Sequence, residues 1–320
     1  MTASAASPPI GGDVGNKLFS ALLVSFLVLF LAASALLLLS NVWYLSGARE
    51  TVGKSGWTLF VQALRSPQTH FAVKLSVLSA AITAALCMVV AIPAAYSLSR
   101  FRFPFSGVVD TLLDLPIVLP PPVIGMSLLI FFRTPAGEFV NHLTPHWLVS
   151  GINWFLTLIL HERVLEDGRW VVQGEIWDDG TNWVYTARGI ILAQFFAACS
   201  FGVRAVKAAF DTIGTRHEEV ARTLGCTRRQ ALFKVVLPMA RNGIVAGAVL
   251  TWARAIAEFG PILFFCSAVQ WKTEVMPIAM FLRNSAGDLE GATALVIIMI
   301  LISALTLLTF KRLGGRGYMW

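Results

Sequence analysis

The sequence contains little charge. Only 13% of its 320 residues are Asp, Glu, Lys or Arg, whereas 56% are hydrophobic, and the mean hydropathy is +0.71. A soluble domain carries roughly 25% charged residues, because its surface must be hydrated. This chain has too few polar residues for such a surface, so most of it is expected to face lipid or other membrane helices.

Cysteine is also scarce. None of the four cysteines lies in a CxxC or Cys/His spacing, so the pattern supports neither a zinc site nor a disulfide framework. We interpret the thiols as small buried apolar groups. They are Cys87, Cys199, Cys226 and Cys266.

Catalytic motifs are missing as well. The chain has no G-x-x-x-x-G-K-[ST] phosphate loop, no H-E-x-x-H and no G-x-S-x-G. His142 and His146 are four residues apart, but Pro145 disfavours the helix that a shared metal site would need. A membrane enzyme is therefore the weaker interpretation, and any ATP hydrolysis must come from another chain.

Long apolar runs dominate the sequence instead. A bilayer core about 30 Å thick needs roughly 20 apolar residues in a helix. Six runs meet this length, which predicts an all-α polytopic membrane protein with six transmembrane helices. The predicted spans are residues 18–45, 71–98, 108–132, 189–210, 243–268 and 292–310.

The first span is expected to be retained rather than cleaved. Only Lys17 precedes it as a basic residue, and no small-residue cleavage site follows it, which argues against a signal peptide. Residues 1–16 are expected to form a disordered cytoplasmic tail, and residues 17–320 a single transmembrane permease domain.

Basic residues set the predicted orientation. In a six-span model with a cytoplasmic N-terminus, three basic clusters fall on one side, as the positive-inside rule requires. Both termini are then cytoplasmic and the protein lies in the cell inner membrane. The same placement argues against nucleic acid as the partner of the net charge of +7. The clusters are Arg100 and Arg102; Arg204, Lys207, Arg216, Arg222, Arg228, Arg229, Lys234 and Arg241; and Lys311, Arg312 and Arg316.

The third connection, residues 133–188, is unusually long and rich in acidic residues. Its apolar segment 147–160 is too short to cross a membrane comfortably, and a span there would move the large basic cluster outside. From Arg169 onward, aromatic and polar residues interleave around Asp178-Asp179-Gly180, which predicts a β-hairpin. We expect an external cap, either a docking surface for an extracytoplasmic partner or an insertion without a role.

The fourth connection, residues 211–242, predicts a short helix, a turn at Gly225 and a second, amphipathic helix. Glycine suits the turn because it tolerates positive φ, and Pro238 suits the start of the next membrane helix. Apolar residues recur near helical spacing and leave the basic residues for solvent or a partner. The apolar residues are Leu224, Ala231, Leu232 and Val235.

This connection resembles the cytoplasmic coupling motif of importer-type ABC permeases, which reads E-A-A, three residues, G, nine residues, I-x-L-P. Val220 and Val235 depart mildly from it. The resemblance implies docking to an ATP-hydrolysing subunit, whereas the alternative is a basic amphipathic helix on the membrane surface. The residues that match at the family's spacing are Glu219, Ala221, Gly225, Leu237 and Pro238.

Other segments resemble the molybdate, tungstate and sulfate permeases of that family, and the resemblance covers residues 64–310. Residues 115–125 look like their proline-rich third-span motif, residues 252–260 like their fifth-span signature, and residues 287–292 like the lead-in to their last span. The long third connection is larger than the group's, so its role cannot be carried over.

Two of these segments place unusual residues at membrane depth. Prolines free backbone carbonyls, which is tolerated only where the backbone faces protein or a cavity. Arg254 and Glu258 are four residues apart and can pair on one helix face, and ionisable residues within a span usually face the bundle interior or a pathway. The alternative is a packing kink with a structural ion pair. Candidates for the pathway or gate are Pro120, Pro121, Pro122, Arg254, Glu258, Phe259 and Gly260.

The resemblance implies the permease subunit of an ATP-driven, binding-protein-dependent oxyanion importer. Within this resemblance, the sequence of residues 253–260 favours molybdate or tungstate over sulfate or thiosulfate. The implied partners are two ATP-binding-cassette ATPase subunits, an extracytoplasmic oxyanion-binding protein and a second permease copy. The chain itself is expected to be no enzyme and to bind no cofactor or metal, with ATP and Mg used by the ATPase. An ATP-independent secondary transporter is the rival, but it would have no reason to keep a coupling motif.

Overall fold

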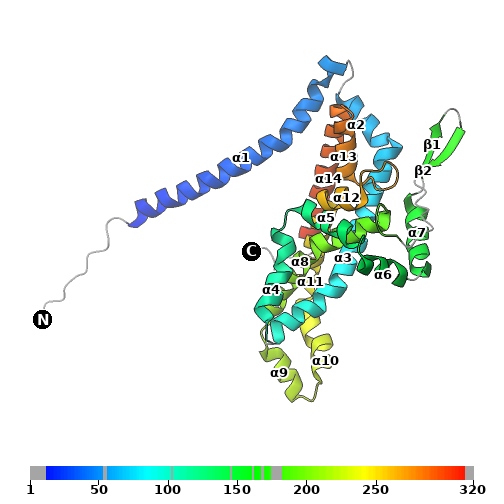
Figure 1. The fold of residues 1–320 in the computed structure, drawn as a ribbon. Coiled ribbons are helices and arrows are strands. Elements are labelled where there is room, and N and C mark those ends of the chain that lie inside the picture. The colour runs from blue at the N-terminus through cyan, green and yellow to red at the C-terminus, as the bar shows by residue number, and fades with distance from the viewer. Residues whose placement is uncertain are drawn as a thin grey trace, which may run out of the picture. The chain divides into compact units, whose positions relative to one another are not determined.

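The computed structural model of this chain consists almost entirely of helices (Figure 1). The structure describes residues 12–52, 56–101, 104–144, 146–160, 162–166, 169–173 and 182–313. The chain divides into two compact units, Met1–Phe60 and Val61–Trp320. Five described helices are long and apolar enough to cross a membrane, or six if one bent pair counts as a span, which agrees with the predicted number.

The first unit contains α1 (Gly12–Val52), whose segment Phe19–Gly47 is the first candidate span. The helix begins before the predicted start at residue 18, so residues 12–16 of the expected tail are helical. Residues 1–11 lie outside the described part of the chain. No proline occurs within α1, so its sequence contains no strong helix breaker.

Three spans of the second unit agree closely with the prediction. They are α3 (Pro67–Arg100), which follows the short α2 (Gly56–Arg65), α8 (Ala187–Ile213) and α14 (Leu289–Leu313). α3 and α8 pack against each other, and both bury many alanines; small residues let helix backbones approach closely in a membrane. The buried alanines are Ala72, Ala80, Ala84, Ala91 and Ala95 on α3 and Ala187, Ala193, Ala197, Ala198 and Ala209 on α8.

The third span is not the single helix that was predicted. It consists of α4 (Ser106–Val118) and α5 (Pro121–Phe131), and the chain bends by 108° between them. The residue before a proline is disfavoured in helical conformation, and here Leu119 and Pro120 are both extended. The prolines therefore divide the span into two helices, in addition to changing its direction.

The predicted fifth span, residues 243–268, is also wrong at both ends. One helix runs without interruption over Arg228–Ile256 and comprises α10 (Arg228–Ala231), the π-helical turn η1 (Leu232–Val236) and α11 (Leu237–Ile256). It stops at Ala257, and the separate α12 (Gly260–Cys266) follows. Gly260-Pro261 explains this break, because proline is tolerated only in the first turn of a helix.

The long third connection folds into α6 (Pro135–Leu143), α7 (His146–Leu160) and a hairpin of β1 (Glu162–Glu166) and β2 (Arg169–Gln173). The hairpin exists, but it lies nearer the N-terminus than predicted, with Glu166 opposite Arg169. Asp167-Gly168, a strong hairpin signal in the sequence, separates its strands. The turn predicted at Asp178-Asp179-Gly180 lies outside the described residues.

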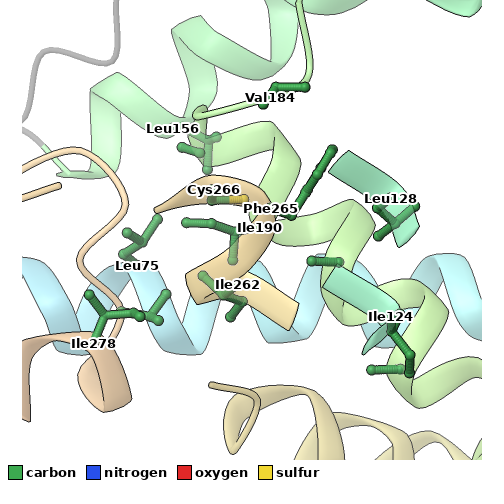
Figure 2. Close-up of a cluster of buried hydrophobic side chains, with 14 of the residues drawn as sticks. Leu75, Ile124, Leu128, Leu156, Val184, Ile190, Ile262, Phe265, Cys266 and Ile278 are labelled. Atoms are coloured by element: carbon green, nitrogen blue, oxygen red, sulfur yellow. The ribbon is translucent and has the colours of Figure 1, made fainter. Parts of the chain in front are cut away.

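A cluster of buried apolar side chains joins six helices of the second unit (Figure 2). It includes Leu156 of α7, which is fully buried, so part of the third connection packs into the core and is more than an external cap. The six helices are α3, α5, α7, α8, α12 and α13 (Met276–Ser285). The cluster residues labelled in Figure 2 are Leu75, Ile124, Leu128, Leu156, Val184, Ile190, Ile262, Phe265, Cys266 and Ile278.

Candidate functional site

The predicted coupling connection forms a helix, a glycine turn and a second helix at one end of the second unit, where α9 (Arg216–Thr223) and α10 lie next to each other (Figure 1). Gly225 follows the end of α9 with a φ of +88°, the left-handed conformation that glycine adopts without strain. The N–H groups of Gly225 and Cys226 donate to the carbonyls of Arg222 and Ala221 at 3.0 and 3.1 Å. This is a Schellman motif, and it confirms the predicted turn.

The second helix of the connection begins with a capping box that we did not predict. The Thr227 side chain accepts a hydrogen bond from the Gln230 N–H at 3.3 Å, and the Gln230 side chain accepts one from the Thr227 N–H at 2.9 Å. The spacing Thr-x-x-Gln is readable in the sequence and was the missed signal. The backbone hydrogen-bonding groups on both sides of the turn therefore have partners within the connection, which favours a rigid connection.

Exposed apolar side chains surround the turn. Leu224 is 81% exposed and Val220 is 51% exposed, although Leu224 was expected on the buried face of the connection. The glycine turn ends α9 before Leu224 and so removes it from the helix's buried side. Ala221 is buried, whereas Glu219 is exposed. The matched residues thus divide into a packed side and a free side that is available to another chain.

The buried acid of this connection is Glu218, next to the predicted Glu219. The Tyr96 hydroxyl donates to Glu218 Oε1 at 2.8 Å, and Arg100 Nε lies 3.4 Å from Glu218 Oε2. Arg100 Nη2 also donates to the carbonyls of Phe210 and Gly214 at the end of α8. These contacts tie α9 to both α3 and α8, and sequence alone could not have shown which of two adjacent glutamates faces inward.

Pro238 lies in the first turn of α11, as predicted for a helix start, but α11 continues the π-helical turn η1 without an interruption. The Leu237 N–H donates to the Leu232 carbonyl, five residues earlier. A proline clashes with the carbonyl four residues before it in an α-helix. The π-helical turn η1 widens the helix immediately before Pro238 and lets the chain continue.

The bend of the third span contains the three predicted prolines. Pro120 precedes α5, and Pro121 and Pro122 occupy its first turn. Helix N-termini bind anions through free backbone N–H groups. Proline has none, and the first N–H after the run, that of Val123, donates to the Pro120 carbonyl at 2.9 Å. This helix end is consequently suited to bending rather than to holding an anion.

The structure brings this bend into contact with the break in the fifth span. A Cβ atom on Gly260 would lie 2.9 Å from the Pro122 nitrogen, and one on Gly125 would lie 2.6 Å from the Pro261 carbonyl oxygen. α5 and α12 therefore pack backbone to backbone, which only glycine permits at these two positions. The proline motif of the third span and the Gly260-Pro261 segment, far apart in sequence, thus form one structural junction.

Arg254 and Glu258 form the predicted ion pair across one turn of helix. The Glu258 side chain is 1% exposed and the Arg254 side chain is 30% exposed. The Arg254 guanidinium also lies over the Phe201 ring, 5.5 Å from its centroid, within the about 6 Å over which a cation and an aromatic ring attract each other. Next along the chain, the Phe259 ring contacts Phe281 of α13 at 5.5 Å between centroids. The Arg254–Glu258 ion pair therefore lies at the C-terminal end of α11, where the fifth span is interrupted.

Two apolar hollows lie beside this break, with volumes of 270 and 550 Å³. Residues of α11, α13 and α14 line them, and Ala257 contributes to both. Their lining, all of it described residues, includes no Lys or Arg. Among the described residues, no group of three or more His, Cys, Asp or Glu side chains could hold a metal.

Arg254→Ala is expected to destabilise the protein because it leaves the Glu258 carboxylate buried without its partner. A buried polar group left without its partner costs about 1–3 kcal/mol and a charged group more, whereas the partial exposure of Arg254 moderates the loss. Thermal unfolding of the detergent-purified complex would measure the loss. Arg254→Lys should lose less, and adding Glu258→Gln to Arg254→Ala should recover part of the stability. A wild-type melting temperature for Arg254→Ala would contradict this role of the pair.

Comparison with known proteins identifies similar chains. Residues 88–316 match the family described as binding-protein-dependent transport system inner membrane component. The sulfate transport system permease protein CysT of Escherichia coli (strain K12) is 30% identical over 300 residues, which cover 94% of this chain and 92% of that protein. The molybdenum transport system permease protein ModB of the same organism is 31% identical over 217 residues, covering 67% and 80%. The molybdate/tungstate transport system permease protein WtpB of Thermococcus kodakarensis is 28% identical over 258 residues, covering 81% and 84%.

Two solved structures share the fold. One is the crystal structure of a bacterial ABC transporter involved in the import of the acidic polysaccharide alginate, with a TM-score of 0.65, 18% identity and coverage of 96% of this chain and 100% of that one. The other is a bacterial alginate ABC transporter in complex with an alginate pentasaccharide-bound periplasmic protein, with a TM-score of 0.64, 19% identity and coverage of 97% and 98%. At this identity the likeness shows the fold alone.

Proposed function

We propose that this chain, which belongs to the family of binding-protein-dependent transport system inner membrane components, imports a tetrahedral oxyanion, with molybdate or tungstate as the first candidate. As a member of that family, the chain is a permease subunit of an ABC importer rather than an enzyme. The ATPase of such an importer is a separate chain. The proposed complex contains two ATPase subunits that use ATP and Mg, a second copy of this permease and an extracytoplasmic binding protein. Both termini are proposed to face the cytoplasm of the inner membrane.

One observation carries the transport mechanism: a single helix, Arg228–Ile256, connects the coupling turn with the break at Ala257. At 1.5 Å per residue it is about 43 Å long, enough to span a bilayer core. A rigid displacement of α9 and α10 by an ATPase would therefore reach the junction of α5 and α12 directly. We propose Glu219, Val220 and Leu224 as the residues that contact the ATPase, because they are exposed beside the capped turn.

The junction itself is proposed to be the gate of the pathway. The prolines of the bend, the Arg254–Glu258 pair, Phe259 and Gly260 meet there, and both hollows open beside it. Neither hollow has a cationic side chain in its described lining, so it is poorly suited to selecting an anion. We therefore assign selectivity to the binding protein, a partner that the alginate transporter complex possesses.

Molybdate or tungstate is supported by residues 253–260, which resemble a signature of the permeases of these anions, and by the overall similarity to ModB and WtpB proteins. Sulfate is the second candidate, because the similarity to the sulfate permease CysT extends over 94% of this chain. All three are tetrahedral dianions, so charge does not separate them.

Uptake of labelled molybdate, tungstate and sulfate by cells lacking this gene tests the proposal. We expect loss of molybdate and tungstate uptake, restored by the wild-type chain, with sulfate uptake unchanged. Loss of sulfate uptake alone would replace the proposed cargo with the second candidate. Uptake of all three at wild-type rates would reject an oxyanion cargo. Restoration by a chain that carries Gly287→Val but not by one that carries Gly225→Val would tie the uptake to the coupling turn.

A further inference from the structure

Arg204 of α8 holds two aspartates of α4, a contact that the sequence did not predict. Arg204 Nη1 donates to Asp110 Oδ1 at 3.0 Å, and Nη2 donates to the Asp110 carbonyl at 3.0 Å. Its Nε and Nη2 both donate to the Asp114 carboxylate. In the sequence Arg204 was grouped with the basic residues of the cytoplasmic side, near the end of the predicted span 189–210. The structure shows it engaged by two acids one helical turn apart.

This contact is the main polar attachment of α4 described in the structure. Within α4, all of which is described, no side chain is buried, and Leu113 is only partly buried against the neighbouring apolar cluster. The helix packs along α8. A helix with so little buried surface depends on a few specific contacts for its position, and one guanidinium supplies four hydrogen bonds here.

The contact of Arg204 with Asp110 and Asp114 lies between the coupling connection and the bend. On one side, α8 runs on toward its end at Phe210 and Gly214, where Arg100 and Glu218 bind it to α9. On the other side, α4 ends at Val118, immediately before the bend at Leu119 and Pro120. Motion of α9 that shifts α8 can reach α4 through this polar contact between the two helices.

We propose that Arg204, Asp110 and Asp114 form an ionic joint that transmits the motion of the coupling connection to the bend, with Arg204 as a positioning residue for transport. This inference rests on the proposed function as an ATP-driven importer. Arginine is suited to the role because its planar fork binds a carboxylate through two parallel hydrogen bonds, which lysine cannot reproduce. The proposal assigns a second route to the gate, separate from the continuous helix Arg228–Ile256.

The three side chains of the joint are partly exposed, so a substitution of Arg204 is not expected to unfold the chain. The exposed fractions of the side chains are 32% for Arg204, 40% for Asp110 and 45% for Asp114. Arg204→Ala leaves two partly exposed carboxylates without their partner, so Arg204→Lys, which keeps the charge, is the second variant should Arg204→Ala not assemble. A matched control lies one turn further along α8: Lys207 pairs with Asp211 of the same helix, a contact that does not involve α4.

The first test uses the full complex in proteoliposomes and measures ATP hydrolysed per anion imported, with molybdate and sulfate as probes. Arg204→Ala and Arg204→Lys are expected to raise this ratio by about fivefold or more, the lower end of typical coupling effects. Lys207→Ala should change it by less than about twofold. Exchanging the charges, with Arg204→Asp and Asp114→Arg together, should restore coupling. A ratio for Arg204→Ala within that twofold range of wild type would overturn the joint.

A second measurement separates failure of this inference from failure of the proposed cargo. Val118, the last residue of α4, is 79% exposed, and Val118→Cys can be labelled with a maleimide in a chain whose four native cysteines are alanine. With Arg204 present, the labelling rate should differ between the nucleotide-free complex and the complex trapped with ATP and vanadate. Arg204→Ala should lose this difference, whereas Lys207→Ala should keep it. A difference that persists in Arg204→Ala would reject the joint, whichever anion the wild-type complex imports.

Discussion

Gly225→Val is expected to abolish transport while leaving the chain in the membrane. Gly225 has a φ of +88°, where an L-residue costs roughly 1–2 kcal/mol and a β-branched one is a genuine outlier. A Cβ atom there would meet no neighbour within 4 Å, so the substitution strains only the backbone of the turn. The Schellman hydrogen bonds to Arg222 and Ala221 would be lost, and α9 and α10 would change their relative direction. Since the turn is exposed, the rest of the bundle should fold.

The measurement is co-purification of the ATPase with the permease, together with substrate-dependent ATP hydrolysis. Gly287 provides a matched control, because it has a φ of +80° and ends α13 with the same pair of hydrogen bonds, to Asn284 and Arg283. Gly287→Val should be strained to a similar degree yet retain the ATPase. Gly225→Asn, which tolerates the left-handed conformation, should retain much of the activity. A Gly225→Val complex that co-purifies and hydrolyses ATP in step with substrate would show that the coupling turn is misassigned.

Gly125→Ala is expected to disrupt the junction between the two broken spans. The added Cβ would lie 2.6 Å from the Pro261 carbonyl oxygen and 2.7 Å from its Cα, and both are backbone atoms that cannot rotate away. Overpacking of this kind costs about 1–3 kcal/mol or more. Alanine in a helix gains about 1 kcal/mol over glycine, so the clash outweighs the gain in helix propensity. We expect a lower melting temperature of the complex and little or no uptake.

The same substitution at Gly107 is the control for this prediction. Gly107 lies in α4 of the same span, and a Cβ there would meet nothing within 4 Å. Gly107→Ala should therefore melt at or above the wild-type temperature, since only helix propensity changes. Wild-type stability and uptake for Gly125→Ala would mean that α5 and α12 do not pack backbone to backbone in the assembled complex.

Features that depend on local chemistry were predicted well. The spans α3, α8 and α14 follow from runs of about 20 apolar residues, which only a membrane accommodates. The turn at Gly225 follows from the conformational freedom of glycine. The capping box at Thr227 and the hairpin signal at Asp167-Gly168 were equally local, and they were overlooked rather than hidden.

Span boundaries were predicted less well where apolar composition continues through a break in the helix. Residues 108–132 and 243–268 are predominantly apolar on both sides of the break, so hydropathy treats each as one span. The backbone is interrupted at Leu119 and at Ala257, and the helix that leads to Ala257 starts at Arg228, inside a basic connection. Hydropathy measures transfer into lipid and carries no information on backbone hydrogen bonding, which decides where a helix ends.

The sequence by itself determined that this chain crosses a membrane, that a glycine turn lies at Gly225 and which family the chain resembles, because apolar length and glycine conformation are properties of neighbouring residues. Only the tertiary structure decided that Glu218 rather than Glu219 is buried, that Gly125 meets Pro261, and that Arg204 binds two aspartates of another helix. Each of these depends on which residues from distant segments come into contact. That choice is made by the packing of whole helices, and no local pattern encodes it.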